Sequence, residues 1–272
     1  MPEIAEVRTV AKTLKEKIVG KKINKIDFIY DKIINEDLNC FSEHVLNKKI
    51  EDINTVGKYL IFNLGEYSLV SHLRMEGKYF IKPINEEIVK HEHIIFYLDD
   101  ISLCYHDTRK FGRMFTCLTS EVMNTKELSK LGFEPNDDKL TENYLYNKIH
   151  KKNIAIKTLL LDQTIINGLG NIYVDEVLFA SNINPSRLGS KITKNECNQI
   201  IKNAKEITDL ATKLGGTTIR SYTSSLGVYG SYQEHLKVHT KDNQKCQVCG
   251  TIILKTRVGG RGTYYCPKCQ KY

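Results

Sequence analysis

Two pairs of cysteines near the C-terminus constrain the fold of this chain more than any other feature of its sequence. Each pair has the spacing Cys-x-x-Cys, and 16 residues separate Cys246 and Cys249 from Cys266 and Cys269. Tetrahedral zinc takes four ligands, and a tight Cys-x-x-Cys turn supplies two thiolates from one bend. We therefore expect one structural Zn²⁺ in a zinc ribbon. Because four thiolates fill every position around the metal, this zinc is not catalytic.

Most of the positive charge of the chain lies in the same segment. The formal net charge is +8, and residues 237–272 contain eight Lys or Arg against one acid, Asp242. Between the cysteine pairs, the sequence predicts strands over 251–258 and 263–265 and a four-residue, glycine-rich turn that carries Arg261. Glycines let a backbone approach a ligand closely. A basic hairpin of this kind favours a phosphate contact and hence a nucleic-acid partner.

Composition excludes several classes of protein. The chain has 272 residues, of which 41% are hydrophobic, so it is long enough for one or two domains with real cores. No apolar run approaches the ~18 residues of a membrane span. The start, Met1-Pro2-Glu3, lacks a secretory signal. We therefore expect a cytoplasmic protein with no membrane partner, whose other cysteines are small buried residues rather than disulfides.

The hydrophobic pattern of the first half predicts a helix followed by a sheet. Apolar residues recur at helical spacing over 3–19. Short runs rich in Ile, Val, Phe and Tyr follow between 21 and 118, which indicates an antiparallel sandwich or barrel. Strands are expected over Tyr59–Leu64, Tyr67–His72, His93–Leu98 and Ile101–His106.

The second half is predicted to be helical. Helices are expected over roughly 141–151, 154–163, 171–180 and 193–213. A segment rich in Gly, Pro and Asp precedes them and is typical of a linker. We therefore expect four consecutive parts, which are residues 1–132, a linker over 133–140, residues 141–236 and the ribbon over 237–272.

The N-terminus combines groups that suit amine chemistry. Removal of Met1 would leave Pro2 with a secondary amine, and α-amines have a reference pKa of roughly 7.7–8.0. Glu3 and Glu6 lie one helical turn apart beside it. A free amine next to carboxylates can form a Schiff base with an aldehyde carbon. The alternative is an ordinary helix start, where proline and acids are common.

Several loops place charged or large side chains where they could meet DNA. Met75 and Phe111 are apolar residues flanked by charge, which suits a wedge between stacked bases. A glycine-flanked turn ends at Asn171, where it can cap a helix or bind a phosphate. The other candidates of this kind are Lys58, His72, Arg109 and Lys152.

Together these motifs resemble bacterial formamidopyrimidine-DNA glycosylase, along essentially the whole chain. The motifs are Pro2-Glu3 with Glu6, Gly57-Lys58-Tyr59-Leu60, His72-Leu73-Arg74-Met75, Asp107 to Gly112, Gly168 to Tyr173, and Gly260-Arg261-Gly262 inside the four-cysteine ribbon. The resemblance implies an α+β fold. An N-terminal β-sandwich with a flanking helix would precede a C-terminal helical domain with a helix-two-turn-helix and the zinc ribbon.

The resemblance also implies catalytic roles. Pro2 would be the nucleophile at C1′ of the damaged nucleotide, and Glu3 would be the general acid that opens the sugar, supported by Glu6. Lys58 would assist β-elimination and hold a phosphate. Arg261 would assist δ-elimination and grip the flanking phosphate.

Further residues match DNA contacts of that family. Met75, Arg109 and Phe111 would fill the gap left by the flipped base. Backbone contacts are implied for His91, Lys152 and Asn171, and His72 belongs to one of the matching motifs. Residues 221–232 correspond to a loop that closes on the lesion.

We therefore predict a base-excision repair enzyme that acts as a monomer on damaged double-stranded DNA. It would be a glycosylase for 8-oxoguanine and formamidopyrimidines with AP lyase activity through β,δ-elimination. Two alternatives stay open at this point. One is the related endonuclease VIII branch, which prefers oxidised pyrimidines, and the other is a non-enzymatic zinc-ribbon protein that binds DNA.

Overall fold

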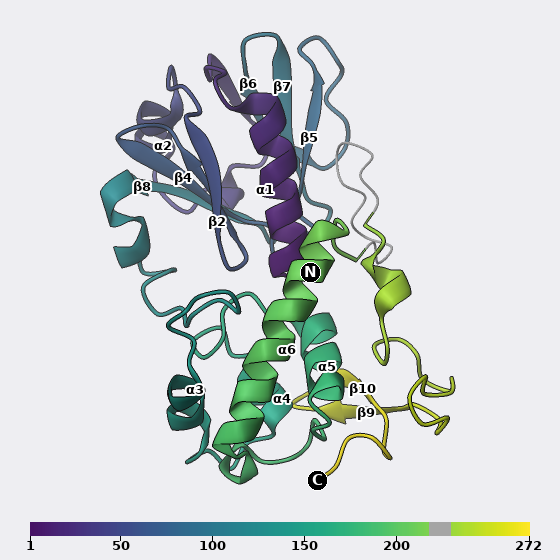
Figure 1. Ribbon diagram of the computed structural model, residues 1–272. Helices are drawn as coiled ribbons and strands as arrows, with labels where there is room; N and C mark the ends of the chain where they lie inside the picture. Colours follow the sequence, from purple (N-terminus) through teal and green to yellow (C-terminus); the bar gives the residue numbers. More distant parts are fainter. Residues whose placement is uncertain (218–229) are drawn as a thin grey trace. The chain divides into compact units, whose positions relative to one another are not determined.

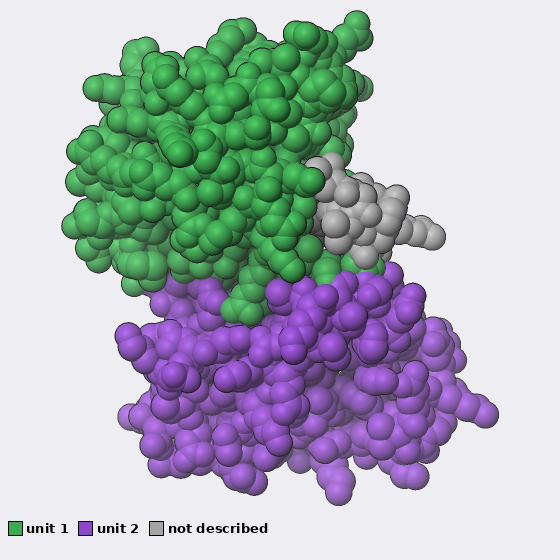
Figure 2. Space-filling view, turned by 45° about the horizontal axis from the view of Figure 1, so that its top comes forward, with its two compact units in different colours: residues 1–129, 215–230 green, residues 130–214, 231–272 purple. Residues whose placement is uncertain are grey.

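The computed structural model divides into two compact units, which Figures 1 and 2 show. The described residues are 1–217 and 230–272, so residues 221–229 of the expected lesion loop lie outside them. Within these described ranges, no helix is both long enough and apolar enough to cross a membrane. The first unit comprises Met1–Ser129 and Gly215–Gly230, and the second comprises Lys130–Leu214 and Ser231–Tyr272.

The first unit contains two four-stranded antiparallel sheets with the orders β1-β6-β7-β5 and β2-β3-β4-β8. The strands are β1 (Lys25–Phe28), β2 (Asp52–Val56), β3 (Tyr59–Asn63), β4 (Tyr67–His72), β5 (Lys78–Pro83), β6 (Glu92–Tyr97), β7 (Ile101–His106) and β8 (Arg113–Leu118). Phe62 and Leu69 from one sheet share a buried core with Tyr79 and Phe96 from the other. The expected β-sandwich is thus confirmed.

Helix α1 (Ile4–Ile18) packs against β2 (Figure 1). Its buried residues include Val7, Val10 and Leu14. This confirms the helix that the periodicity predicts over 3–19. The sequence analysis did not predict α2 (Leu38–Val45) or the short helices η1 (Asp31–Ile33) and η2 (Thr119–Asn124). Cys40 on α2 is exposed and Cys117 is half-buried, so the expectation of small buried cysteines holds for Cys104 and Cys197 only.

The second unit contains the helices that follow the sheets in the sequence, of which α5 and α6 pack against each other (Figure 1). They are α3 (Glu142–Ile149), α4 (Ile156–Leu160), α5 (Asn171–Ala180) and α6 (Lys194–Lys213), with the short η3 (Gly189–Lys191) and η4 (Tyr232–His235). Helix α4 is shorter than predicted. The segment 133–140 packs within this unit, because the backbone of Phe133 pairs with Ile166 and the side chain of Asn136 bonds to Asp209.

The ribbon hairpin consists of β9 (Leu254–Val258) and β10 (Arg261–Tyr265), paired antiparallel. Val258 pairs with Arg261, so the turn contains only Gly259 and Gly260, with φ of 55° and 74°. The predicted four-residue turn is therefore wrong. A two-residue turn with both φ positive matches the twist of the strands, and it makes Arg261 the first residue of β10.

Candidate active site and zinc ribbon

The amino end of the chain lies in a buried and charged part of the first unit. Pro2 is buried, and burial lowers the pKa of the α-amine of Met1, the residue before it, below its usual value. The carboxylates of Glu3, Glu6 and Glu76 oppose this shift, whereas the ammonium of Lys58 adds to it. The predicted residues at the start of the chain therefore share one electrostatic environment with Lys58. Burial lowers the pKa of an amine and leaves more of it unprotonated near pH 7, so this part of the unit suits an amine nucleophile.

Glu3 and Glu6 form a capping box at the start of α1. The Glu3 side chain accepts the backbone N–H of Glu6, and Oε2 of Glu6 accepts the N–H of Glu3 at 2.9 Å. Oε1 of Glu6 also accepts the N–H of Thr217 at 2.8 Å and its hydroxyl at 3.0 Å. Glu6 thus bonds to the start of the chain at Glu3 and to Thr217, and it fixes the first turn of α1.

Lys58 belongs to the tight turn between β2 and β3. Val56 pairs with Tyr59, so the turn consists of Gly57, whose φ is 56°, and Lys58. The Lys58 side chain is buried, with a relative exposure of 5%. A two-residue hairpin turn holds its residues in a narrow range of conformations. The fold therefore fixes the base of this side chain rather than leaving it on a mobile loop.

His72 lies at the end of β4 and is a neutral imidazole. Burial, together with the positive charges of Arg74 and Lys58, lowers the pKa of His72 to about 3. Its Nδ1 accepts the N–H of Arg74 at 2.9 Å, and its ring meets that of Tyr59 edge-on at 4.5 Å. Near pH 7 its side chain therefore carries no charge.

One buried carboxylate organises the loop that carries Arg109 and Phe111. The side chain of Asp107 accepts backbone N–H groups from Arg109 at 3.0 Å, Phe111 at 2.9 Å and Gly112 at 2.8 Å. A Cβ at Gly112 would lie 1.7 Å from the hydroxyl of Tyr105, so only glycine fits there. The sequence analysis missed this role of Asp107. The signal was present, because an Asp that starts a turn commonly caps the following N–H groups.

Arg109 and Phe111 of this loop, together with Met75 from the loop between β4 and β5, have the character of a wedge between stacked bases. Phe111 is 47% exposed, the guanidinium of Arg109 stacks over its ring at 4.7 Å, and Met75 is half-buried. The hydroxyl of Thr108 donates to the carboxylate of Glu76, which also acts on the terminal amine. Glu76 was not predicted as a site residue. It contacts the loop of residues 107–112, which we call the wedge loop, and its charge also acts on the amine at the start of the chain.

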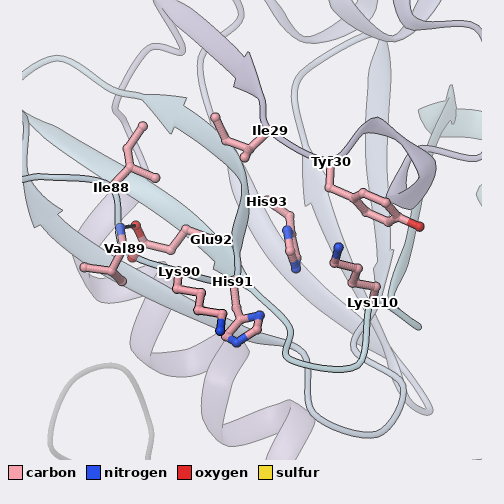
Figure 3. Close-up of a pocket in the computed structure, with 9 residues that line it drawn as sticks. All are labelled: Ile29, Tyr30, Ile88, Val89, Lys90, His91, Glu92, His93 and Lys110. Atoms are coloured by element: carbon pink, nitrogen blue, oxygen red, sulfur yellow. Dashed lines mark hydrogen bonds between the residues drawn. The ribbon is translucent and has the colours of Figure 1, made fainter.

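A hollow of about 440 Å³ lies beside the wedge loop (Figure 3). Glu92 belongs to its wall, but the Glu92 carboxylate pairs with Lys82 at 2.7 Å and accepts the N–H of Val89 at 2.9 Å. The remaining charged side chains of the wall are basic, so the hollow favours an anion. Its lining residues are Ile29, Tyr30, Ile88, Val89, Lys90, His91, Glu92, His93 and Lys110.

The other predicted DNA contacts belong to the second unit. Arg261 is exposed at the start of β10, and Lys152 is half-buried between α3 and α4. Asn171 opens α5, and its Nδ2 donates to the carbonyl oxygen of Gly262 at 3.0 Å. Among the described residues, none is a hydrogen-bond partner of its buried Oδ1. The residue after Arg261 is thus tied to the first residue of α5.

The four cysteines of the ribbon form the predicted metal site. Their sulfur atoms all lie within 4.8 Å of one another. The Sγ–Sγ distance is 3.9 Å between Cys246 and Cys269 and 3.4 Å between Cys249 and Cys266. A zinc ion with four Zn–S bonds of ~2.3 Å requires sulfur atoms about 3.8 Å apart. The geometry fits one structural Zn²⁺, which confirms that prediction.

Comparisons with known proteins agree along the whole chain. The N-terminal domain of formamidopyrimidine-DNA glycosylase matches residues 1–114, and its H2TH domain matches 131–223. The zinc finger found in FPG and IleRS matches residues 243–271. These matches confirm the predicted α+β fold with its helix-two-turn-helix and zinc ribbon.

Individual relatives give the same result. Formamidopyrimidine-DNA glycosylases of Bacillus cereus and Lactobacillus delbrueckii are 45% and 42% identical, and each match covers at least 99% of both chains. A Lactococcus lactis Fpg solved with abasic-site DNA is 38% identical, with a TM-score of 0.94 over 99% of this chain and 100% of that one. The same enzyme with N7-benzyl-Fapy-dG DNA is 39% identical over 100% of each chain, with a TM-score of 0.94. The endonuclease VIII and non-enzymatic alternatives are not favoured, and the chain belongs to the formamidopyrimidine-DNA glycosylase family.

Proposed function

We propose that this DNA glycosylase of base-excision repair uses the Pro2 amine to excise oxidised purines, 8-oxoguanine and formamidopyrimidines, and then cleaves the strand. The observation that carries the proposal is the start of the chain, where Pro2 is buried and burial lowers the pKa of the adjoining Met1 amine, on which the charges of Glu3 and Lys58 also act. Relatives named formamidopyrimidine-DNA glycosylase and Fpg complexes with damaged DNA support the substrate class.

The chemistry needs the groups that the first unit provides. The lone pair of the Pro2 nitrogen attacks C1′, and the base leaves with the electrons of the glycosidic bond. Glu3 gives a proton to the sugar oxygen as the ring opens, and the nitrogen loses its own proton to leave an iminium. The iminium acidifies the C2′ proton, and its removal expels the 3′ phosphate. Lys58 assists this β-elimination.

Arg261 assists the second cleavage. Loss of a C4′ proton expels the 5′ phosphate in the δ-elimination, and a guanidinium stabilises the negative charge on the departing phosphate. The ribbon places Arg261 directly after a rigid two-residue turn. Zinc, when bound by the four cysteines, holds the ribbon folded. No chemical step passes through the metal.

Other residues of the two units contact the DNA in this proposal. Met75, Arg109 and Phe111 fill the space of the extruded nucleotide, which offsets part of the unstacking energy of a few kcal/mol. His91 binds a phosphate at the basic hollow of Figure 3, where the acid of the wall is already paired. Further backbone contacts come from His72, Lys152 and Asn171.

The proposed setting is the bacterial cytoplasm, where the enzyme acts as a monomer on double-stranded DNA. The four-part division into residues 1–132, 133–140, 141–236 and 237–272 stays a prediction. It differs from the two compact units in that residues 130–140 and 231–272 belong to one unit with the helices.

Borohydride trapping tests the proposal. The wild-type protein, with Met1 removed as checked by intact mass, should form a covalent adduct with 8-oxoguanine duplex DNA. Pro2→Glu should retain Met1, because a large second residue blocks its removal, and it should form no adduct. An adduct of undiminished yield with Pro2→Glu would place the nucleophile elsewhere. Faster excision of thymine glycol than of 8-oxoguanine would instead favour the pyrimidine branch.

A further inference from the structure

The second unit contains a buried cluster of charged side chains that the proposed reaction does not use. Lys157 of α4 and Asp175 of α5 are both 0% exposed at their side chains, and His239 is 8% exposed. The Nζ of Lys157 lies 2.7 Å from Oδ1 of Asp175, and the Nδ1 of His239 lies 2.8 Å from Oδ2. One carboxylate thus joins two helices to the segment that leads into the ribbon.

The same cluster reaches the ribbon hairpin. Lys157 donates a second hydrogen bond to the carbonyl oxygen of Gly262 at 2.9 Å, and Asn171 donates to the same oxygen at 3.0 Å. Oδ2 of Asp175 faces the N–H of Tyr264 at 3.4 Å. The ring of His239 also meets that of Tyr264 edge-on at 4.9 Å. Strand β10 is therefore held at Gly262 by Lys157 and Asn171, and at Tyr264 by Asp175 and His239.

The other side of the hairpin is fixed by packing. A Cβ on Gly259 would lie 2.4 Å from Oγ1 of Thr158, so the turn sits directly against α4. Arg261 lies between this contact and the bonded carbonyl of Gly262. Its backbone is anchored on both sides, although its own side chain is exposed.

A buried lysine and carboxylate are costly to desolvate and are weak evidence for stability by themselves. Their value here is geometric, because the Lys157 ammonium binds the Asp175 carboxylate and the Gly262 carbonyl at the same time. We propose that Asp175 is a positioning residue for Arg261: through Lys157 and His239 it fixes the start of β10 where Arg261 assists δ-elimination. This inference rests on the proposed function, since it takes the role of Arg261 from there.

Asp175→Asn is the informative change, because an amide has almost the same shape but only one acceptor oxygen. If its oxygen accepts the hydrogen bond from Lys157, its NH2 group faces the His239 ring and the N–H of Tyr264 in place of the second carboxylate oxygen. The assay follows the 3′ ends formed on abasic-site DNA in a single turnover. The aldehyde-bearing end reports β-elimination alone, and the 3′-phosphate end reports β,δ-elimination.

We expect Asp175→Asn to raise the ratio of β to β,δ products at least fivefold. Base release from 8-oxoguanine DNA and the borohydride adduct should stay within twofold, and zinc content should stay at one per chain. Glu176→Gln is the matched control. Glu176 is an equally buried neighbour that accepts the N–H groups of Lys237, Val238 and His239 and makes no bond to Gly262.

An unchanged product ratio in Asp175→Asn, or an equal rise in Glu176→Gln, would overturn the proposal. If Asp175→Asn does not fold, His239→Gln serves instead, because it removes the imidazole's bond to Asp175 and its contact with Tyr264 but leaves Lys157 paired with Asp175. It should raise the ratio of β to β,δ products about twofold, and an unchanged ratio would also overturn the proposal. Absence of any δ product from the wild-type protein would instead refute the role of Arg261 in the proposed function.

Discussion

Replacement of Asp107 by asparagine tests how the wedge loop is held. Asp107 is 0% exposed, and its two oxygens accept three backbone N–H groups of the loop. Oδ2 accepts from Phe111 and Gly112, whereas Oδ1 accepts from Arg109. Asparagine can keep its oxygen on the Oδ2 side, but its amide nitrogen then faces the N–H of Arg109. One charge-assisted bond is lost, and the other two become neutral.

The expected loss of binding free energy follows from these hydrogen bonds. A hydrogen bond to a charged group contributes about 1.5–3 kcal/mol, and the lost one involves a partly exposed N–H, so we take a total of ~2 kcal/mol. Such a change in the ordering of the loop lowers affinity for DNA that needs the ordered loop by up to about 30-fold. We expect a 10- to 30-fold weaker Kd for a duplex with a tetrahydrofuran abasic analogue, measured by fluorescence anisotropy.

Two comparisons make this measurement decisive. Undamaged duplex of the same sequence does not require the wedge, so its Kd should change less than threefold. Asp100→Asn is the control, since Asp100 is an exposed carboxylate whose ion pair is with Lys21 and not with the loop of Arg109 and Phe111. A Kd for Asp107→Asn within twofold of the wild-type value, or an equal loss in Asp100→Asn, would refute the reasoning.

Three further predictions concern charge, pH and metal. Because the pKa of His72 is about 3 in the folded protein and roughly 6.5 unfolded, stability present above pH 6.5 should fall by about 1.4 kcal/mol per unit below it. His72→Gln should remove about 2 kcal/mol of the loss between pH 6.5 and 5 in urea titrations, and an unchanged slope would contradict this. Glu76→Gln removes a charge that raises the pKa of the Met1 amine. The Pro2 amine formed by removal of Met1 should respond in the same way, so the acid limb of the trapping-rate profile should move to lower pH. Thr108→Val, which breaks the loop contact but keeps the charge, should not move it. Chelation of zinc should abolish DNA binding while residues 1–129 stay folded by circular dichroism, and undiminished binding after verified zinc loss would count against the ribbon.

The sequence predicted those features that depend on local pattern. The zinc site was predictable because each Cys-x-x-Cys turn brings two sulfur atoms together, and α1 because its buried residues recur at helical spacing. Helix α2 was missed although Asp37 caps it and both Phe41 and Val45 are buried four residues apart. Eight residues are too few for a clear periodic signal, and packing against the sheets decides that the segment is helical.

The features that were missed depend on contacts between distant residues. Lys157 and Asp175 are 18 residues apart, and Lys157 and Gly262 are 105 apart. No local pattern distinguishes a lysine that will be fully buried from one on a helix surface. The length of the ribbon turn was also missed, because the number of glycines does not fix the strand register. The contact of Gly259 with Thr158 and the pairing of Val258 with Arg261 fix it instead.

The geometry also separates two carboxylates that the sequence places side by side. Both oxygens of Glu6 accept backbone or hydroxyl hydrogens, from Glu3 on one side and from Thr217 on the other. Gly216, with a φ of 79°, leaves room for this, because a Cβ there would lie 2.7 Å from Oε1 of Glu6. Both oxygens of Glu6 are thus committed to holding the start of α1 and residue 217. Glu6 therefore suits a positioning role, and Glu3 is the better candidate for proton transfer at the sugar.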